Sequence, residues 1–228
     1  MDKPEIDWQS VDTVLLDMDG TLLDLHFDNH FWLEHVPRRY AEAHDIPLAA
    51  ARRELLSRYR DKEGTLEWYC LDHWSRELGL DIALLKQEVE HLIAVHPHVV
   101  EFLQAVRRHG KRLALVTNAH QKALRLKMER TRLAGYFDQV VCAHDLGLPK
   151  EDPRFWEALQ GVFPFDSRRT LFVDDSVAVL RSAEDYGIRW LLAIRRPDSR
   201  GPQREGGRFE AIGNFRQVMP PSAIAGGE

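Results

Sequence analysis

Two carboxylates separated by one residue follow an apolar run near the start of the chain, in the segment Asp17-Met18-Asp19-Gly20-Thr21. Because side chains alternate along an extended strand, Asp17 and Asp19 point to the same side and their like charges lie close together. This arrangement costs free energy unless a cation lies between the carboxylates or one of them stays protonated to act as an acid. On this motif alone, an exposed acidic turn that closes a strand is the alternative interpretation.

Further polar residues follow later apolar runs. Thr117-Asn118 end one run, Pro149-Lys150 come after another, and Asp174-Asp175 end a third. In a parallel α/β sheet, ligands bind at the carboxyl ends of the strands, so we expect these groups to converge with Asp17 and Asp19. A carboxylate cluster of this kind binds a hard divalent cation such as Mg²⁺. The lysine and the hydroxyl group would complete a pocket for a dianionic phosphoryl group.

The elements that must position these residues are predicted by alternating strand and helix patterns. The expected buried strands are Val11–Asp17, Arg112–Thr117, Gln139–Ala143, Thr170–Asp174 and Trp190–Ile194. The expected helices between and after them are His98–His109, Gln121–Ala134, Pro153–Gln160 and Val177–Tyr186. Glycines at 110, 135 and 187 follow three of these helices and are typical helix ends. This alternation predicts an α/β protein with a parallel sheet that helices cover on both faces.

Residues 22–95 interrupt the alternation with helical patterns alone. The expected helices are Asn29–His44, Leu48–Arg60, Leu66–Leu78 and Ile82–Val95, with Asp28, Thr65 and Asp81 as N-caps and Gly79 ending the third. Pro37 should kink or split the first helix. We therefore predict a core of residues 1–23 and 96–228 and an inserted all-helical domain of residues 24–95. The tail from Arg196 is loop-like, and Phe209–Val218 are expected to pack back onto the core.

Composition narrows the classes of protein to consider. The 228 residues carry a net charge of −5 and no long basic run, so a nucleic-acid partner is not expected. No apolar run approaches the ~20 residues that span a membrane, and the first residues lack a secretory signal. Cys70 and Cys142 make no metal-ligand spacing and are expected to be reduced, buried thiols. We expect a cytoplasmic enzyme, with a monomer favoured.

Aromatic residues and histidines of the inserted segment are the candidates for substrate contacts. The residues at 66, 69, 70, 73, 74 and 78 form one helical stripe, which is the usual sign of packing. Trp68 falls outside that stripe and is the better candidate for contact with a base. Asn29 and His30 could meet a ribose or a base.

For the other histidines, a structural role is favoured over metal binding or substrate contact. The pairs His26/His30 and His96/His98 have spacings that could share a metal, but no further ligands lie nearby in the sequence, so ordinary surface histidines are favoured. His120 follows Thr117-Asn118-Ala119 and therefore lies near the expected phosphate site. A role at the start of a helix is favoured over contact with substrate.

The four motifs together resemble those of the haloacid dehalogenase-like superfamily: Asp-x-Asp-Gly-Thr, a strand-end threonine, a lysine and Asp-Asp, in this order. The resemblance implies a Rossmann-like core and makes the inserted helices a helical cap. Several segments further resemble the GMP/IMP nucleotidases of bacteria, from about Trp8 to Ser199: Val11–Thr21, Phe27–Asn29, Trp68–Asp72, Thr117–His120 and Pro149–Asp152. An aspartate at position 19 sets the chain apart from the superfamily's dehalogenases, which usually carry tyrosine there.

The resemblance also implies roles for the site residues. Asp17 would be the nucleophile that forms an aspartyl-phosphate, and Asp19 would be the general acid and then the general base. Mg²⁺ would be held by a side-chain oxygen of Asp17, the backbone carbonyl of Asp19 and Asp175, with Asp174 acting through water. Lys150, Thr117 and the backbone amides near Met18 and Asn118 would bind the phosphoryl oxygens.

The expected function is that of a Mg²⁺-dependent phosphomonoesterase acting on purine nucleoside 5′-monophosphates. A phosphatase of another small ester, such as a sugar phosphate, or a phosphomutase is the alternative within the enzymes. A non-catalytic phosphate-binding protein is the alternative outside them. Such a protein would be expected to lose Asp17, Asp19 or Lys150, and all three are present.

Overall fold

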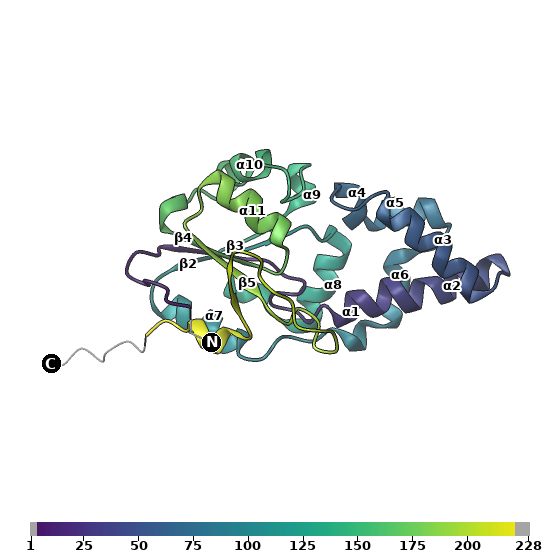
Figure 1. Ribbon diagram of the computed structural model, residues 1–228, viewed down its shortest axis with the longest axis horizontal. Helices are drawn as coiled ribbons and strands as arrows, with labels where there is room; N and C mark the ends of the chain where they lie inside the picture. Colours follow the sequence, from purple (N-terminus) through teal and green to yellow (C-terminus); the bar gives the residue numbers. More distant parts are fainter. Residues whose placement is uncertain (1–3, 222–228) are drawn as a thin grey trace.

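A six-stranded parallel sheet forms the centre of the molecule (Figure 1). The computed structural model describes residues 4–221. The strands are β1 (Thr13–Leu16), β2 (Arg112–Thr117), β3 (Gln139–Cys142), β4 (Thr170–Asp174), β5 (Trp190–Ile194) and β6 (Glu210–Ile212), in the order β3-β2-β1-β4-β5-β6. Leu16 at the end of β1 pairs with Leu115 and Val173, so the carboxyl ends of β1, β2 and β4 lie together. The predicted α/β class is confirmed.

Successive strand residues face opposite sides of the sheet, and each side carries its own helices. The core helices are α7 (Val99–Arg108), α8 (Gln121–Thr131), α9 (Ala143–Leu146), α10 (Arg154–Val162) and α11 (Val177–Tyr186). Val14 and Leu16 belong to the hydrophobic cluster that includes α7 and α8 residues. Leu15 belongs to the second cluster, with residues of α10 and α11. Burial on both faces explains why the strands read as continuous apolar runs.

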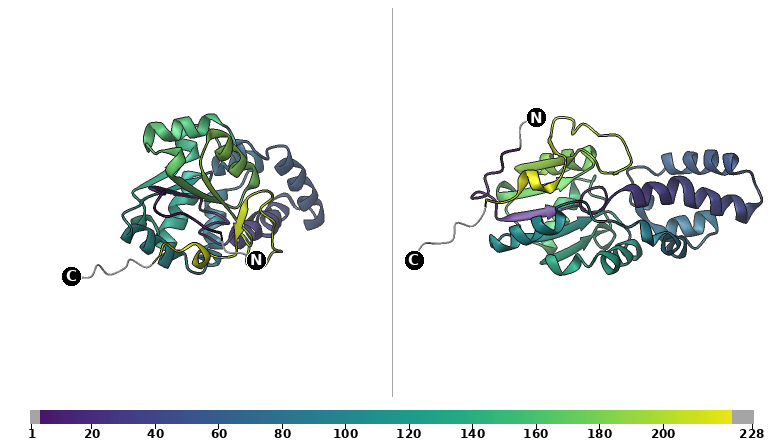
Figure 2. Two further views of the ribbon diagram at one scale, coloured as in Figure 1. Left: turned by 60° about the vertical axis from the view of Figure 1, so that its left-hand side comes forward. Right: turned by 90° about the horizontal axis from the view of Figure 1, so that it is seen from below.

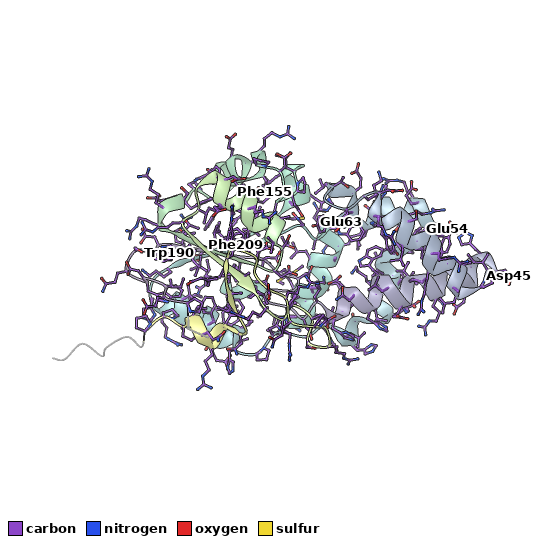
Figure 3. All side chains as sticks on the ribbon, viewed as in Figure 1. Asp45, Glu54, Glu63, Phe155, Trp190 and Phe209 are labelled. Carbon is purple, nitrogen blue, oxygen red and sulfur yellow. The ribbon has the colours of Figure 1, made fainter. Side chains whose placement is uncertain are left out.

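The segment between β1 and α7 forms a separate group of helices, here called the helical insertion (residues 26–92). Its elements are α1 (His26–His30), a π-helical turn (Phe31–His35), α2 (Val36–His44), α3 (Leu48–Arg60), α4 (Leu66–Tyr69), α5 (Leu71–Leu78), α6 (Ile82–Glu88) and a 3₁₀ turn (Glu90–Leu92). The insertion extends from one end of the core (Figures 1 and 2). Asp45, which ends α2 with a left-handed backbone (φ 50°), lies at its far tip (Figure 3).

Two short segments join the insertion to the core and lie side by side. Leu23 and Val95 form an antiparallel bridge. The amide of Asp24 donates to the carbonyl of Ala94, and the amide of His96 donates to the carbonyl of Leu22. The chain therefore leaves and re-enters the core at one place.

The first half of the insertion bears out one prediction and corrects two. The helical pattern predicted over 29–44 is divided next to Pro37, which lies in the first turn of α2 directly after the π-helical turn. Asp28 is not an N-cap, because α1 begins at His26 and Asp28 lies within it. Thr65 occupies the N-cap position of α4, but its hydroxyl donates to the carbonyl of Lys62 instead of capping.

The second half of the insertion also differs in part from the prediction. Asp81 caps α6 as expected, since its carboxylate accepts from the amide of Leu84. The helix predicted over 66–78 is broken at Cys70, whose extended backbone separates α4 from α5. The helix predicted over 82–95 ends at Glu88, and a 3₁₀ turn follows.

Within the core, α8 is shorter than predicted, and the sheet contains a strand, β6, that was not predicted. α8 ends at Thr131, because Arg132 adopts a left-handed conformation (φ 59°), and the predicted end at Gly135 is wrong. The segment after Arg196 returns to the core through β6 and a 3₁₀ turn (Phe215–Val218), as expected for 209–218, although its strand was not predicted. Among residues 4–221, no helix has the length and apolar character needed to cross a membrane.

Candidate active site

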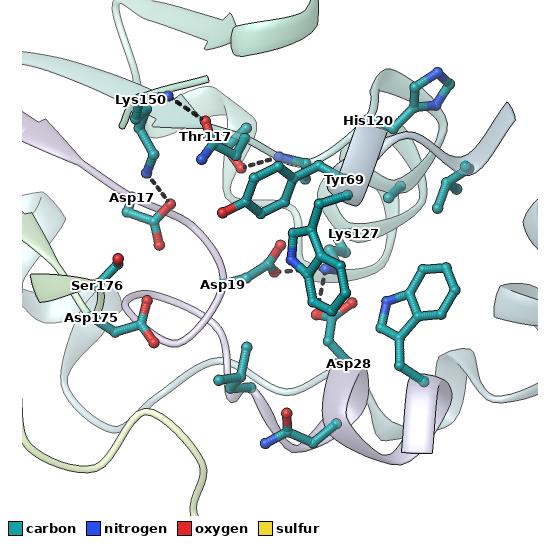
Figure 4. A pocket seen from close by; sticks show the side chains of 18 of the residues that line it. Asp17, Asp19, Asp28, Tyr69, Thr117, His120, Lys127, Lys150, Asp175 and Ser176 are labelled. Carbon is teal, nitrogen blue, oxygen red and sulfur yellow. Dashed lines mark hydrogen bonds and ion pairs between the residues drawn. The ribbon is translucent and has the colours of Figure 1, made fainter. Parts of the chain in front are cut away.

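The carboxyl edge of the sheet gathers the residues that the motifs singled out (Figure 4). Asp17 follows β1, Asp174 ends β4, and Lys150 comes from the loop after α9. The Lys150 Nζ donates to Asp17 Oδ1 at 2.6 Å, to Asp174 Oδ2 at 2.7 Å and to the carbonyl of Val116 at 3.1 Å. One buried ammonium thus bridges two carboxylates from adjacent strands.

Burial and charge set the protonation of this group. Burial raises the pKa of Asp17 to about 6, an effect that Lys150 opposes and Asp174 reinforces. Burial alone would lower the pKa of Lys150, but the carboxylates of Asp17 and Asp174 outweigh it and raise that pKa. The lysine therefore stays charged and holds Asp17 in a fixed orientation.

The other oxygen of Asp17, Oδ2, is buried and has no hydrogen-bond partner. Carboxylate oxygens of Asp17, Asp174 and Asp175 lie within 4.8 Å of one another. A buried carboxylate oxygen without a partner, beside two further carboxylates, is a donor set that fits a hard divalent cation. These residues are able to hold such an ion.

Asp174 and Asp175 differ in the hydrogen bonds that their carboxylate oxygens already accept. Both oxygens of Asp174 accept hydrogen bonds, from Lys150 and from the amide of Ser176. Asp175 has a longer contact of 3.4 Å with the Arg204 guanidinium. Burial, reinforced by Asp174 and Asp17, raises the pKa of Asp175 well above its usual range. Asp175 is therefore the carboxylate whose charged form a bound cation would stabilise most.

Gly20 is required next to Asp175. Its backbone has a φ of 82°, and a Cβ placed there would lie 2.7 Å from both Cγ and Oδ2 of Asp175. The glycine in the Asp-x-Asp-Gly-Thr motif thus lets the loop after β1 approach the Asp175 carboxylate.

Thr117 and Asn118 shape the loop opposite Asp17. The Thr117 hydroxyl accepts from the amide of Ala119 at 3.0 Å. The Asn118 Oδ1 accepts from the amide of Lys150, and its Nδ2 donates to Glu151. The side chain of Asn118 therefore organises the lysine loop, while the side chain of Met18 is fully buried.

A second buried charge network surrounds Asp19, and sequence reasoning missed it. Lys127 Nζ, from α8, donates to Asp19 Oδ1 and to Asp28 Oδ2, each at 2.7 Å (Figure 4). Lys86 Nζ, from α6, donates to Asp28 Oδ1 at 2.7 Å. Burial raises the pKa of Asp19 to about 6, with Lys127 acting against it. The network joins the core to the helical insertion through Asp28.

A cavity of about 330 Å³ opens between the carboxylate edge and the helical insertion. This size is at the lower end of the range for small-molecule sites, about 300–1,000 Å³. The aromatic residues that line it are Trp32, Tyr59, Trp68 and Tyr69. Trp68 thus faces the cavity, as its place outside the helical stripe suggested.

Tyr69 was assigned to packing within that stripe, and this interpretation is wrong. The break at Cys70 turns α4 away from α5, so Tyr69 lines the cavity and its hydroxyl donates to Glu151 Oε1 at 2.8 Å. Trp74 does pack inside the insertion, with its Nε1 donating to the carbonyl of Trp68.

The remaining candidates have structural partners. Asn29 lines the cavity, and its Nδ2 donates to Asp198 Oδ2 at 2.7 Å. The rings of His26 and His30 lie 6.0 Å apart, and His96 Nε2 contacts the carbonyl of Pro197. No cluster of possible metal ligands in residues 4–221 includes these histidines. His120 precedes α8, where its Nδ1 accepts from the amide of Lys122, which confirms a role at the helix start.

The parallel sheet, with aspartates and a lysine at its carboxyl edge and helices inserted after the first strand, defines an α/β enzyme of the hydrolase class. The chain belongs to the haloacid dehalogenase-like hydrolase family, whose model matches residues 11–187.

Comparisons with individual proteins agree with this assignment. The chain is 41% identical over 215 residues to the GMP/IMP nucleotidase YrfG of Escherichia coli (strain K12), covering 94% of this chain and 97% of that protein. It is 28% identical over 132 residues to phosphoglycolate phosphatase 1 of Pseudomonas aeruginosa, covering 57% of this chain and 47% of that protein. The crystal structure of a phosphatase of this family from Thermococcus onnurineus superposes with a TM-score of 0.73 at 25% identity, covering 84% and 89% of the two chains.

Proposed function

We propose that this protein is a Mg²⁺-dependent phosphomonoesterase that hydrolyses purine nucleoside 5′-monophosphates through an aspartyl-phosphate. The observation that carries the proposal is Asp17, whose Oδ1 is held by Lys150 while its buried Oδ2 has no partner beside the aromatic-lined cavity. The identity of 41% to a GMP/IMP nucleotidase over nearly the whole chain supports the substrate class.

In this proposal the reaction has two halves. In the first, a carboxylate oxygen of Asp17 forms a bond to phosphorus while the ester bond to the ribose O5′ breaks, and Asp19 gives its proton to O5′. In the second, Asp19 takes a proton from water, which attacks phosphorus and releases phosphate and free Asp17. A pKa of about 6 for Asp19 suits both transfers near neutral pH.

Asp17 and Asp175 would hold the metal ion, together with the backbone carbonyl of Asp19, and Asp174 would act through water because its oxygens already have partners. When bound, Mg²⁺ neutralises negative charge between the phosphoryl oxygens and the carboxylates. Lys150, Thr117 and the amides near Met18 and Asn118 would bind and orient the phosphoryl oxygens.

The helical insertion would act as a cap over the cavity, with the boundaries of the cap at residues 24 and 95. Three of its residues, Trp32, Tyr59 and Trp68, supply apolar faces at the cavity, and such faces stack well on a purine. The contacts Tyr69–Glu151 and Asp28–Lys127 cross from the insertion to the core and would hold the closed position. Closure would exclude water from the phosphoryl group.

The substrate is tested by phosphate release from a panel of nucleoside and sugar monophosphates in the presence of Mg²⁺. We expect IMP and GMP to give the highest kcat/KM. The variant Trp68→Ala should lose at least tenfold of kcat/KM for purine monophosphates and much less for a small aryl phosphate. Trp190→Ala, in β5 and outside the cavity, is the matched control and should affect all substrates equally. Equal losses for Trp68→Ala on every substrate would refute a purine-stacking role.

A phosphatase of another small ester is the second candidate, since the chain also matches phosphoglycolate phosphatases at lower identity. Highest activity on phosphoglycolate or a sugar phosphate would favour it, and transfer of phosphate to a second sugar position would favour a phosphomutase. We also place the enzyme in the cytoplasm, which the free thiols of Cys70 and Cys142 support.

A further inference from the structure

A cysteine and two histidines from three separate segments meet where the helical insertion faces the core. Cys70 lies at the break between α4 and α5, His120 precedes α8, and His144 lies in α9. One possible ligand atom from each residue lies within 4.8 Å of the other two. His120 lines the side of the cavity and lies apart from Asp17 and Asp19 (Figure 4). The spacing of 70, 120 and 144 along the chain gives no sign of this cluster.

Of the two histidines, His144 presents a ring nitrogen without a partner, and His120 lies beside it. His144 Nε2 is buried without a hydrogen-bond partner, and the ring also hydrogen-bonds with the backbone of Asn118. His120 Nδ1 accepts a long hydrogen bond of 3.4 Å from the amide of Lys122, which a metal ion would replace, and the Nε2 that carries the proton of the neutral ring faces Asp72 Oδ2 at 3.7 Å. Burial lowers the pKa of both histidines, so their rings are neutral near pH 7. A neutral imidazole whose second nitrogen has a protein partner is the form that binds metals.

The donor types differ from those of the carboxylate site. Asp17, Asp174 and Asp175 offer hard oxygen atoms, which suit Mg²⁺. A thiolate and two imidazoles instead suit a borderline ion such as Zn²⁺, which is bound tetrahedrally by three protein ligands and one further group. Asp72 is not a member of this group, but its Oδ2 faces His120 Nε2 and can orient that ring, which leaves the fourth position to water.

We propose that Cys70, His120 and His144, with water in the fourth position, form a second metal site that binds Zn²⁺ and fastens the helical insertion to the core. Cys70 comes from the insertion, whereas His120 and His144 come from the core. Binding releases the proton of the Cys70 thiol to solvent as the thiolate coordinates the ion.

The distances between the ligand atoms also indicate how Zn²⁺ binding would move Cys70. Tetrahedral ligands at Zn–S of about 2.3 Å and Zn–N of about 2.0–2.1 Å lie about 3.3–3.6 Å from each other. The ligand atoms here lie within 4.8 Å, so Zn²⁺ would draw Cys70 toward the core by no more than about 1.5 Å. Trp68 and Tyr69 directly precede Cys70 and line the cavity. The bound ion therefore holds this wall of the cavity closed.

The absorption spectrum of bound Co²⁺ tests the site without any substrate turnover. A thiolate ligand gives a sulfur-to-cobalt charge-transfer band, and tetrahedral coordination gives intense visible bands. The titration is done on the full chain with saturating Mg²⁺ present, so that the carboxylate site is filled. We expect one Co²⁺ per chain with both spectral features, and displacement of Co²⁺ by Zn²⁺. Cys70→Ser should abolish the charge-transfer band, and His144→Ala should weaken binding at least tenfold.

Two control variants remove the same residue types elsewhere. Cys142→Ser removes the other thiol, which donates to the carbonyl of Ala119, and His91→Ala removes an exposed histidine of the insertion. Both should keep the full cobalt spectrum. A charge-transfer band that survives in Cys70→Ser, or the absence of stoichiometric binding to wild type, would overturn the site.

Fastening of the insertion is measured by hydrogen exchange in the connecting segments 22–24 and 94–96. Zn²⁺ should slow exchange there in the wild type and leave exchange in Cys70→Ser unchanged. Stoichiometric Zn²⁺ binding without such protection, or equal protection in the variant, would refute the fastening. Neither readout needs a substrate, so these results are independent of the proposed phosphatase activity.

Discussion

Replacing Lys127 by methionine removes the cation at the centre of the buried network that joins α8, Asp19 and Asp28. Lys127 is 1% exposed, and its Nζ lies 2.7 Å from an oxygen of each carboxylate. Removing one partner of a buried ion pair costs about 3–5 kcal/mol, because an uncompensated charge remains. Asp28 keeps its contact with Lys86, so we expect a loss near the lower limit, about 3 kcal/mol of unfolding free energy.

The same substitution should change catalysis through Asp19. Burial raises the pKa of Asp19 to about 6 and Lys127 opposes that effect, so the pKa rises further when the ammonium is lost. A larger fraction of Asp19 is then protonated at pH 7, and its action as a base in the second half of the reaction is slowed. We expect kcat at pH 7 to fall at least about tenfold, which is part of the total contribution of about 10²–10⁴ from acid–base catalysis. Raising the pH should restore part of the loss.

The measurements are urea unfolding and the dependence of kcat on pH. Lys122→Met is the matched control, because Lys122 lies in the same helix but its ion pair with Asp72 is exposed. Exposed pairs contribute about 0–1 kcal/mol, so this control should unfold much like the wild type. Equal unfolding free energies for the two variants, together with an unchanged pH profile for Lys127→Met, would refute the role assigned to the network.

Three further predictions concern the metal site and the same network. Gly20→Ala should raise the Mg²⁺ concentration needed for activity by at least tenfold, because its Cβ would lie 2.7 Å from Oδ2 of Asp175; a normal Mg²⁺ titration would contradict this. Burial opposes ionisation of Asp28, but Lys127 and Lys86 outweigh it and lower its pKa from 3.8 to about 2. This shift corresponds to about 2.5 kcal/mol of stability, which is present above pH ~4 and lost as the pH falls through 2. Asp28→Asn should therefore be less stable than the wild type in urea at pH 6, with a difference that narrows toward pH 2; a constant difference would argue against the ion pairs. Removal of Mg²⁺ by a chelator should stop phosphate release, and Ca²⁺ should restore it poorly because its looser coordination misplaces Asp17, so full activity in Ca²⁺ would count against the proposed metal geometry.

Much of the fold and the central part of the site could be predicted from local sequence. Strand runs such as Thr170–Asp174 are buried on both faces and read as continuous apolar segments, and their polar ends identify the carboxyl edge of the sheet. Since parallel strands bring these ends together, Asp17, Lys150 and Asp174 could be placed in one site from the sequence alone.

Features that depend on contacts between distant segments could not be predicted in this way. Lys127 reads as an ordinary charged residue of an amphipathic helix, and only the approach of the helical insertion to α8 buries it beside Asp28. The break at Cys70 occurs within a good helical pattern, yet it turns Tyr69 into the cavity. β6 has three residues, too few to give a periodic signal.

The central claim is that Asp17 accepts the phosphoryl group, and it is tested most directly by trapping the intermediate. The enzyme is mixed with IMP and Mg²⁺, quenched in acid and treated with borohydride, which converts an aspartyl-phosphate into homoserine. Mass spectrometry of the peptides should then find homoserine at position 17 in the wild type and at no position in Asp17→Asn. Phosphate release from IMP by the wild type with no modification at Asp17, or with the modification at another residue, would contradict the account.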